Sequence, residues 1–149
     1  MNDFQRSLPM MLYRTLDCVL PAFRQIYQEF GITEQQWRVL RVLWETDSQS
    51  LLALAEATLI SSPSLVGIVD RLARNGLVER RRSKTDRRVV HILVTRSGKE
   101  LEHAVRPRID EIYNVLEASV SPSLWHSLFE AMDQINRSAA ARNKAAQNI

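Results

Sequence analysis

The chain has a single cysteine, Cys18, among 149 residues, so an internal disulfide framework is excluded. Glycine and proline are also scarce, at four and five residues, and the absence of low-complexity runs argues against disorder away from the ends. No apolar run approaches the roughly 20 residues that a membrane-spanning helix needs. The first residues lack the basic start and the cleavage site of a signal peptide. We therefore expect a cytoplasmic protein with no membrane partner.

Motifs for catalysis and for metal binding are missing as well. The sequence has no glycine-rich phosphate loop, no histidine–carboxylate cluster and no activated nucleophile. Its three histidines, His91, His103 and His126, are scattered, and no pair has the spacing of metal ligands. We expect no catalytic residues, no metal site and no cofactor. An enzyme that acts on a small aromatic compound is the weaker alternative.

The most informative segment runs from residue 71 to residue 88. It holds eight basic residues and two acidic ones, a net charge of +6 in a chain whose total is +3. The rest of the chain is therefore mildly acidic, although the pI is near 9.4. A basic excess confined to one short segment marks one face of the protein for a polyanion such as nucleic acid.

Hydrophobic spacing predicts a mainly α-helical chain with a small β-hairpin, an α+β fold. Apolar residues three and four positions apart predict helices over 7–31 and 97–147, in which Pro21 and Pro107 should kink or break the helix. The long faces of these two helices favour pairing between two copies of the chain. The alternative is that they fold back on the same chain.

Between the long helices, residues 33–95 predict a compact lobe. Thr33 to Gln36 has the pattern of a capping box, and a third helix follows Ser50, with Leu52, Ala55 and Leu59 facing inward. A fourth helix begins at Ser61 and ends at Gly76, and its buried side is predicted to be Leu65, Ile68, Val69 and Leu72. Two strands with a charged turn follow it. Three helices and a basic hairpin are the arrangement of a winged helix-turn-helix. Two paired copies would match two DNA half-sites about 34 Å apart.

The segment SSPSLVGIVDRLARNGLVERRRSKTDRRVVHILVT, residues 61–95, resembles the MarR family of bacterial transcriptional regulators. Asp86-Arg87-Arg88 resembles the D-x-R signature of that family's wing, and Val94-Thr95 follows it at the proper distance. The segment TEQQWRVLRVL, with Phe23-Arg24 before it, is similar to the branch of the family that controls homoprotocatechuate (hydroxyphenylacetate) degradation.

The resemblance implies one MarR-type chain over residues 1–149. Residues 7–31 and 97–147 would be dimerisation helices, and residues 33–95 a winged helix-turn-helix lobe that binds DNA. It further implies a homodimer that represses transcription by binding a palindromic operator in double-stranded DNA. A small aromatic or phenolic acid, the effector, would bind between the dimer core and the lobe and release the DNA.

The fourth helix is the candidate for reading the major groove, since its first-turn amides and hydroxyls can donate to DNA and Gly67 permits close approach. The alternative is that this segment is an ordinary amphipathic helix with a good N-terminal cap and no role in reading DNA. The resemblance assigns Arg88 to the minor groove, where Asp86 can orient its guanidinium. The predicted DNA contacts are Ser62, Pro63, Ser64, Gly67, Arg71, Arg74, Arg80, Arg81, Arg82, Lys84, Asp86, Arg87 and Arg88.

Arg14, Trp37 and Arg38 are the candidates for binding the effector, because an arginine beside an aromatic ring suits an aromatic carboxylate. The alternative is that Trp37 is a core residue and the arginines face water. Cys18 raises a rival function, redox sensing. Because the sensing cysteine of peroxide-responsive relatives would fall near Pro9 here, we interpret Cys18 as a buried, inert thiol. A protein-binding adaptor is a third possibility, but it gives the cationic hairpin no role.

We predict that Arg88→Ala abolishes tight operator binding while the dimer stays folded. The reason is that the arginine is assigned to insert into the minor groove rather than to support the fold. Fluorescence anisotropy with labelled operator, alongside thermal unfolding, measures both properties. Operator affinity equal to that of the wild type would refute the minor-groove role.

Overall fold

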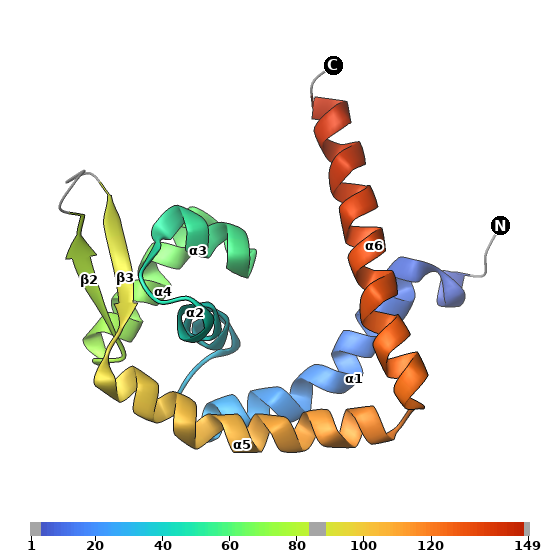
Figure 1. Cartoon of the computed structure of the whole chain (residues 1–149), viewed down its shortest axis with the longest axis horizontal. Coiled ribbons are helices and arrows are strands. Elements are labelled where there is room, and N and C mark those ends of the chain that lie inside the picture. Colours follow the sequence, from blue (N-terminus) through green and yellow to red (C-terminus); the bar gives the residue numbers. More distant parts are fainter. Residues whose placement is uncertain (1–3, 84–88, 148–149) are drawn as a thin grey trace. The chain divides into compact units, whose positions relative to one another are not determined.

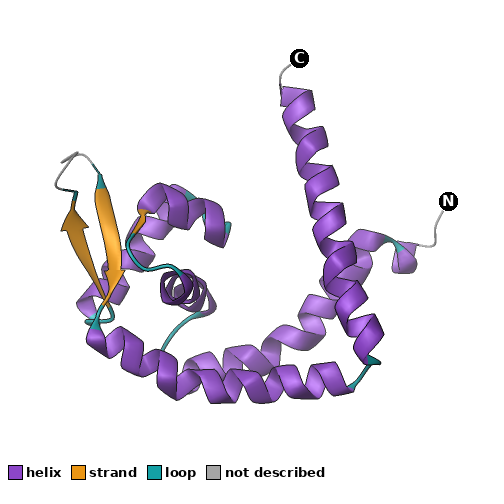
Figure 2. Cartoon of the chain, viewed as in Figure 1, coloured by secondary structure: helices purple, strands orange, loops and turns teal. Residues whose placement is uncertain are grey.

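A computed structural model of the chain describes residues 4–83 and 89–147 (Figure 1). Helices predominate, and the strands form one small antiparallel sheet (Figure 2), which confirms the mainly α fold with a winged helix-turn-helix. The chain divides into two compact units, Met1–Ile109 and Asp110–Ile149. The elements in order are η1 (Phe4–Arg6), α1 (Leu8–Glu29), α2 (Glu34–Glu45), β1 (Gln49–Ser50), α3 (Leu51–Thr58), α4 (Ser62–Arg74), β2 (Val78–Arg82), β3 (Val90–Val94), α5 (Arg96–Ala118) and α6 (Pro122–Gln147).

The boundaries of the helices follow local signals in the sequence. The Thr33 side chain accepts a hydrogen bond from the Gln36 amide, and the Gln36 side chain accepts one from the Thr33 amide, so the predicted capping box is confirmed. Neither Pro21 nor Pro107 breaks its helix, contrary to one of the two expected outcomes. Both prolines lie on exposed helix surface, where water can bond the carbonyl that proline leaves unpaired.

The core of the first unit lies where α2, α3 and α4 pack on the sheet. The fully buried side chains come from all of these elements and include Leu40, Leu54, Leu65 and Ile92. The inner face of α4 is Leu65, Ile68, Val69 and Leu72, which confirms the predicted stripe. Gly76 ends this helix with a φ of +71°, a conformation that glycine adopts without strain.

The inward face predicted for α3 was wrong. Leu52 and Leu59 are 66% and 87% exposed, and the buried positions are Leu54 and Thr58, with Ile60 just beyond the helix. Because α3 is apolar around most of its circumference, its periodicity does not select a face. Leu59 also lies past the last helical residue, with a left-handed φ of 55° that turns its side chain away from the core.

The sheet has a third strand that the sequence analysis did not predict. The order is β1-β3-β2, so β3 is the central strand, with Val78 opposite Val94, Arg80 opposite Ile92 and Gln49 also opposite Ile92. β1 has only two residues, too few to show the alternation that identifies a strand. Its pairing with β3 joins segments far apart in the sequence.

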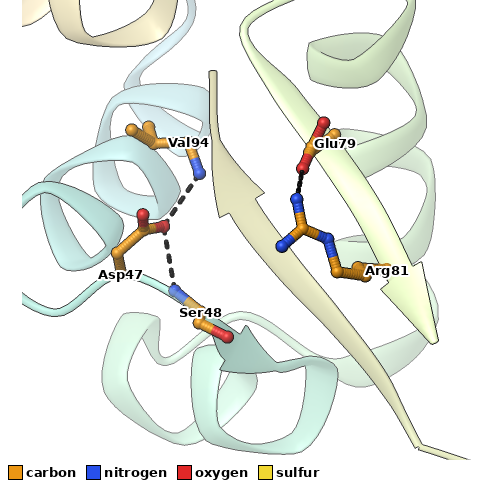
Figure 3. A network of polar contacts seen from close by, with 5 residues as sticks. All are labelled: Asp47, Ser48, Glu79, Arg81 and Val94. Atoms are coloured by element: carbon orange, nitrogen blue, oxygen red, sulfur yellow. Dashed lines mark hydrogen bonds and ion pairs between the residues drawn. The ribbon is translucent and has the colours of Figure 1, made fainter. Parts of the chain in front are cut away.

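A carboxylate holds the loop before β1 against the end of β3 (Figure 3). One oxygen of Asp47 accepts hydrogen bonds from the amides of Ser48 and Val94, both at 2.9 Å. At the same end of the hairpin, the Thr95 hydroxyl donates to the Gly76 carbonyl at 2.6 Å and accepts from the Gly98 amide at 3.1 Å. These contacts join the end of α4, the base of the hairpin and the start of α5.

The first turn of α5 passes very close to the segment between α4 and β2. A Cβ atom added at Gly98 would lie 2.3 Å from the carbonyl oxygen of Leu77 and 3.1 Å from a methyl group of Val94. The carbonyl of Gly98 also accepts a hydrogen bond from the indole of Trp44 at 3.1 Å. Only glycine fits at this position, because the closest atom belongs to rigid backbone.

Several long helices carry large apolar side chains that nothing in their own unit covers. On α1 only Phe23, Ile26 and Tyr27 are buried, and the exposed apolar residues of its first half are Leu8, Met11, Leu12, Tyr13 and Leu16. In the second unit Trp125 packs edge-on against Phe129, and the exposed apolar residues of α6 are Leu124, Leu128, Phe129 and Ile135.

Within the described residues no single helix is long and apolar enough to cross a membrane. Among these helices only α3 and α4 taken together have the length and composition of a membrane span, and the pair is bent by 107°.

Gly98→Ala should destabilise the fold by about 1–3 kcal/mol, because the new methyl group has to displace the Leu77 backbone or the start of α5. Urea unfolding measures the change. Gly67→Ala is the matched control: it places the same methyl group within a helix where the nearest atom, apart from the chain neighbours and the helix backbone, is 3.7 Å away at the end of the Arg71 side chain. Since alanine favours helix more than glycine does, equal stabilisation by both variants would contradict this packing.

Candidate nucleic-acid interface

The outer face of α4 is largely exposed and consists mostly of small, polar and basic residues. Helical spacing places Pro63, Gly67 and Arg74 along the middle of this face, opposite the buried stripe. Ser64 and Arg71 lie on one flank of it, and the other flank includes Asp70. A helix of this width, with small residues along the middle of its outer face, can enter the major groove of DNA.

The N-terminus of α4 differs from the starts of α2 and α3. Ser50 and Thr33 cap their helices through side-chain oxygens, whereas the Ser61 side chain makes no capping bond to the backbone of α4. The Ser61 and Ser64 hydroxyls instead bond each other at 3.0 Å. The first-turn amides of α4 therefore remain available to an anion, and the positive end of the helix dipole favours one.

Two arginines meet at the C-terminal end of the same helix. Arg71 and Arg74 line a pocket of about 390 Å³ together with Gln36 and Asn75. Both arginines are exposed, and neither has an ion-pair partner among residues 4–83 and 89–147. Two free cations beside one pocket are suited to a phosphate group.

Strand alternation divides the arginines of β2 between the two faces of the hairpin. Val78, Arg80 and Arg82 share one face, and Val78 is buried in the core while Arg82 is exposed near the far end of the strand. Glu79 and Arg81 share the other face, where they form an ion pair at 2.5 Å (Figure 3). The hairpin therefore presents basic side chains on both of its faces.

Arg80 forms an ion pair with Asp70 of α4 at 2.7 Å. This pair joins β2 to the helix proposed to read DNA, and the sequence analysis did not single out Asp70. In the sequence Asp70 is the one acidic residue of α4, which could have drawn attention to it. Its partner Arg80 lies beyond the turn at Gly76, so helical spacing does not identify the pair. Because both side chains are partly exposed, the pair contributes little stability and acts mainly by fixing direction.

The described part of the hairpin thus separates two kinds of arginine. Arg80 and Arg81 are held by carboxylates, whereas Arg82, like Arg71 and Arg74, has no such partner among the described residues. Lys84, Asp86, Arg87 and Arg88, the predicted contacts at the hairpin tip, lie outside the described residues.

The three candidate effector residues have separate surroundings. Trp37 stacks on Tyr27 with ring centres 5.0 Å apart and meets the edge of Trp44 at 5.3 Å, so it links α1 to α2. The Arg14 side chain is exposed and donates to Gln5. Arg38 is half-buried and donates to the Thr58 carbonyl at 3.0 Å. No described contact joins these three side chains to one another.

Arg38 has one feature that the other candidates lack. Its Nε atom is buried and has no hydrogen-bond partner among the described residues. A buried donor without an acceptor costs about 1–3 kcal/mol. A polar acceptor that reached this nitrogen would recover that cost.

Comparison with known proteins identifies the family. The MarR family model matches residues 32–90, which include α2, α3, α4 and β2 and end at the first residue of β3. The homoprotocatechuate degradative operon repressor of Escherichia coli is 33% identical over 86% of this chain and 86% of its own length. The chain belongs to the MarR family. The transcriptional regulator FarR of Neisseria gonorrhoeae is 34% identical over 74% of the chain and 76% of its own length.

Solved structures agree with this assignment. Ligand-free NadR superposes with a TM-score of 0.82 at 29% identity, over 92% of this chain and 98% of that one. NadR in complex with 4-hydroxyphenylacetate superposes with a TM-score of 0.79, also at 29% identity, over 91% and 96%. The MarR-family chain is a transcriptional regulator related to repressors, and not the enzyme kept as an alternative.

Cys18 of this MarR-family chain is exposed, so its interpretation as a buried thiol was wrong. It lies on the side of α1 away from Phe23, Ile26 and Tyr27, the residues of that helix that are buried. The interpretation rested on the position of the sensing cysteine in relatives, and that position carries no information on whether the Cys18 side chain is covered. Redox sensing through Cys18 stays an alternative hypothesis.

Among the described residues no group of three or more His, Cys, Asp or Glu side chains could hold a metal ion.

The salt dependence of DNA binding should distinguish the two kinds of arginine. Arg82→Ala should flatten the slope of log affinity against log salt concentration by about 0.9 for each half-site, because one phosphate contact is lost. Arg80→Ala should lower affinity with little change of slope, because Arg80 is engaged with Asp70. Titration of operator DNA at several salt concentrations measures both. Equal changes of slope would contradict the distinction, and circular dichroism checks that both variants are folded.

Proposed function

We propose that this MarR-family regulator is a homodimeric repressor that binds a palindromic operator and is released by a small aromatic or phenolic acid. The observation that carries the proposal is the outer face of α4. The Ser61 side chain does not cap its first-turn amides, and its N-terminal half carries the small residues Pro63 and Gly67 along the middle. Its far end carries Arg71 and Arg74, which have no ion-pair partner among the described residues. These features suit the approach of a DNA duplex.

The exposed apolar side chains of α1 and α6 support the homodimer. Each carries several leucines and aromatic residues that nothing in its own unit covers. Burying such a side chain is worth about 1.5–3 kcal/mol, so a second copy of the chain that covered both faces would gain substantially. Symmetric pairing is also the commonest form of association in soluble proteins.

A two-fold dimer presents two identical lobes, and this arrangement supports a palindromic operator. In each lobe α4 would lie in the major groove, with Ser62, Pro63, Ser64 and Gly67 nearest the DNA at its N-terminal half. Arg71, Arg74 and Arg82 are the proposed phosphate contacts. The assignments of Arg80, Arg81, Lys84, Asp86, Arg87 and Arg88 to DNA, with Arg88 in the minor groove, stay predictions.

Two relatives support an aromatic acid as the effector. The similar Escherichia coli protein is named as a repressor of homoprotocatechuate degradation, and NadR has been crystallised with 4-hydroxyphenylacetate. Among the candidates Arg14, Trp37 and Arg38, we favour Arg38 as the group that receives the carboxylate. Its unsatisfied Nε gives it a reason to bind an acceptor.

The proposal is tested with DNA selected from a random duplex pool by the full-length protein. Light scattering should give the mass of a dimer. The selected DNA should contain an inverted repeat, and 4-hydroxyphenylacetate should release it in an anisotropy titration. A monomer, or a protein that enriches no sequence at low salt, would refute the proposed repressor. If hydroxyphenylacetates, benzoates and cinnamates all failed to release the DNA, the effector class would be wrong.

Arg38→Ala should leave operator affinity nearly unchanged and raise the concentration of acid needed for release at least tenfold, since charge-assisted pairs of this kind are the strong ones. Arg96→Ala is the control, because Arg96 is 93% exposed and pairs with Glu100 on the surface. A normal response to the acid in Arg38→Ala would remove Arg38 from the effector site.

A further inference from the structure

One large apolar side chain lies outside the buried stripe of α4. Val66 is 41% exposed, whereas Leu65, Ile68, Val69 and Leu72 are buried. The other exposed or half-buried positions of this helix are serine, proline, glycine, alanine, aspartate and arginine. The fold gains little from valine here, because a β-branched residue lowers helix propensity and this side chain is only partly buried.

The residue that follows Val66 is Gly67, which has no side chain. Apart from its chain neighbours and the helix backbone, the nearest described atom to a Cβ built at Gly67 is the end of the Arg71 side chain, at 3.7 Å. A partner can therefore approach the helix backbone beside Val66 closely. Asp70, one turn after Val66, directs its carboxylate to Arg80 at 2.7 Å.

The chemistry of the major groove limits which group can pack against an exposed apolar side chain on this helix. Base edges there present hydrogen-bond donors and acceptors, and the only apolar group among them is the 5-methyl group of thymine. Valine offers no hydrogen bond, and its restricted χ1 angle holds the two methyl groups in place. An apolar group of methyl size is therefore the partner that matches this position.

We propose that Val66, beside the bare backbone at Gly67, forms a specificity contact with the 5-methyl group of one thymine in each operator half-site. The inference rests on the proposed function, because it requires that the outer face of α4 enters the major groove. It adds a base preference, and a residue responsible for it, to a helix whose other exposed side chains are polar or small.

The test replaces each thymine of the selected operator with deoxyuridine, one symmetric pair at a time, which removes the methyl group and keeps every hydrogen-bonding atom. Wild-type protein should lose affinity at one position by about fourfold for each half-site, or about fifteenfold for the pair, from the burial of one methyl-sized group. Val66→Ala should bind the thymine and the deoxyuridine operators equally. Anisotropy titration at fixed salt measures all four affinities.

Leu52→Ala is the matched control, since Leu52 is an exposed leucine of the same lobe on α3, and it should keep the wild-type discrimination. The inference is overturned if wild-type protein is indifferent to every substitution, or if Val66→Ala still prefers thymine at the sensitive position. In both cases the operator would still be bound, so the proposed function would stand. Failure of the wild type to bind any selected DNA would instead remove the proposed function itself.

Discussion

The position of the hairpin depends on the close approach of α5 to the segment that joins α4 and β2. Gly98 permits this approach, because any side chain there would overlap the Leu77 carbonyl. Thr95 bonds to both sides of the contact, and Asp47 holds the other edge of β3 through the Val94 amide. A residue in the first turn of α5 therefore sets where the hairpin lies relative to α4, through backbone contacts that tolerate little displacement.

The base of the hairpin lies next to the elements that are proposed to face DNA. The Asp70–Arg80 pair adds a second link between α4 and β2, farther along the hairpin. This pair fixes direction more than it adds stability, since an exposed ion pair is worth little in water. The two links hold β2 in a defined position relative to α4, as the proposed contact of helix and hairpin with one duplex requires.

Local patterns allowed much of the lobe to be predicted. The capping box at Thr33, the buried stripe of α4 and the turn at Gly76 each depend on residues within a few positions of one another. Long-range choices were missed or misjudged for a common reason. The strand β1 is too short to show a period, α3 is too uniformly apolar to show a face, and nothing near Cys18 in the sequence specifies whether its side chain is covered.

The sequence by itself determined that a basic segment follows an amphipathic helix, and hence that the chain carries a surface for a polyanion. Charge and periodicity are local properties, so they can be read without knowing how the chain folds. Only the tertiary structure decided which arginines are engaged by carboxylates and which are free. That distinction depends on which atoms meet across the turn at Gly76 and across the strands, and no spacing along the chain specifies it.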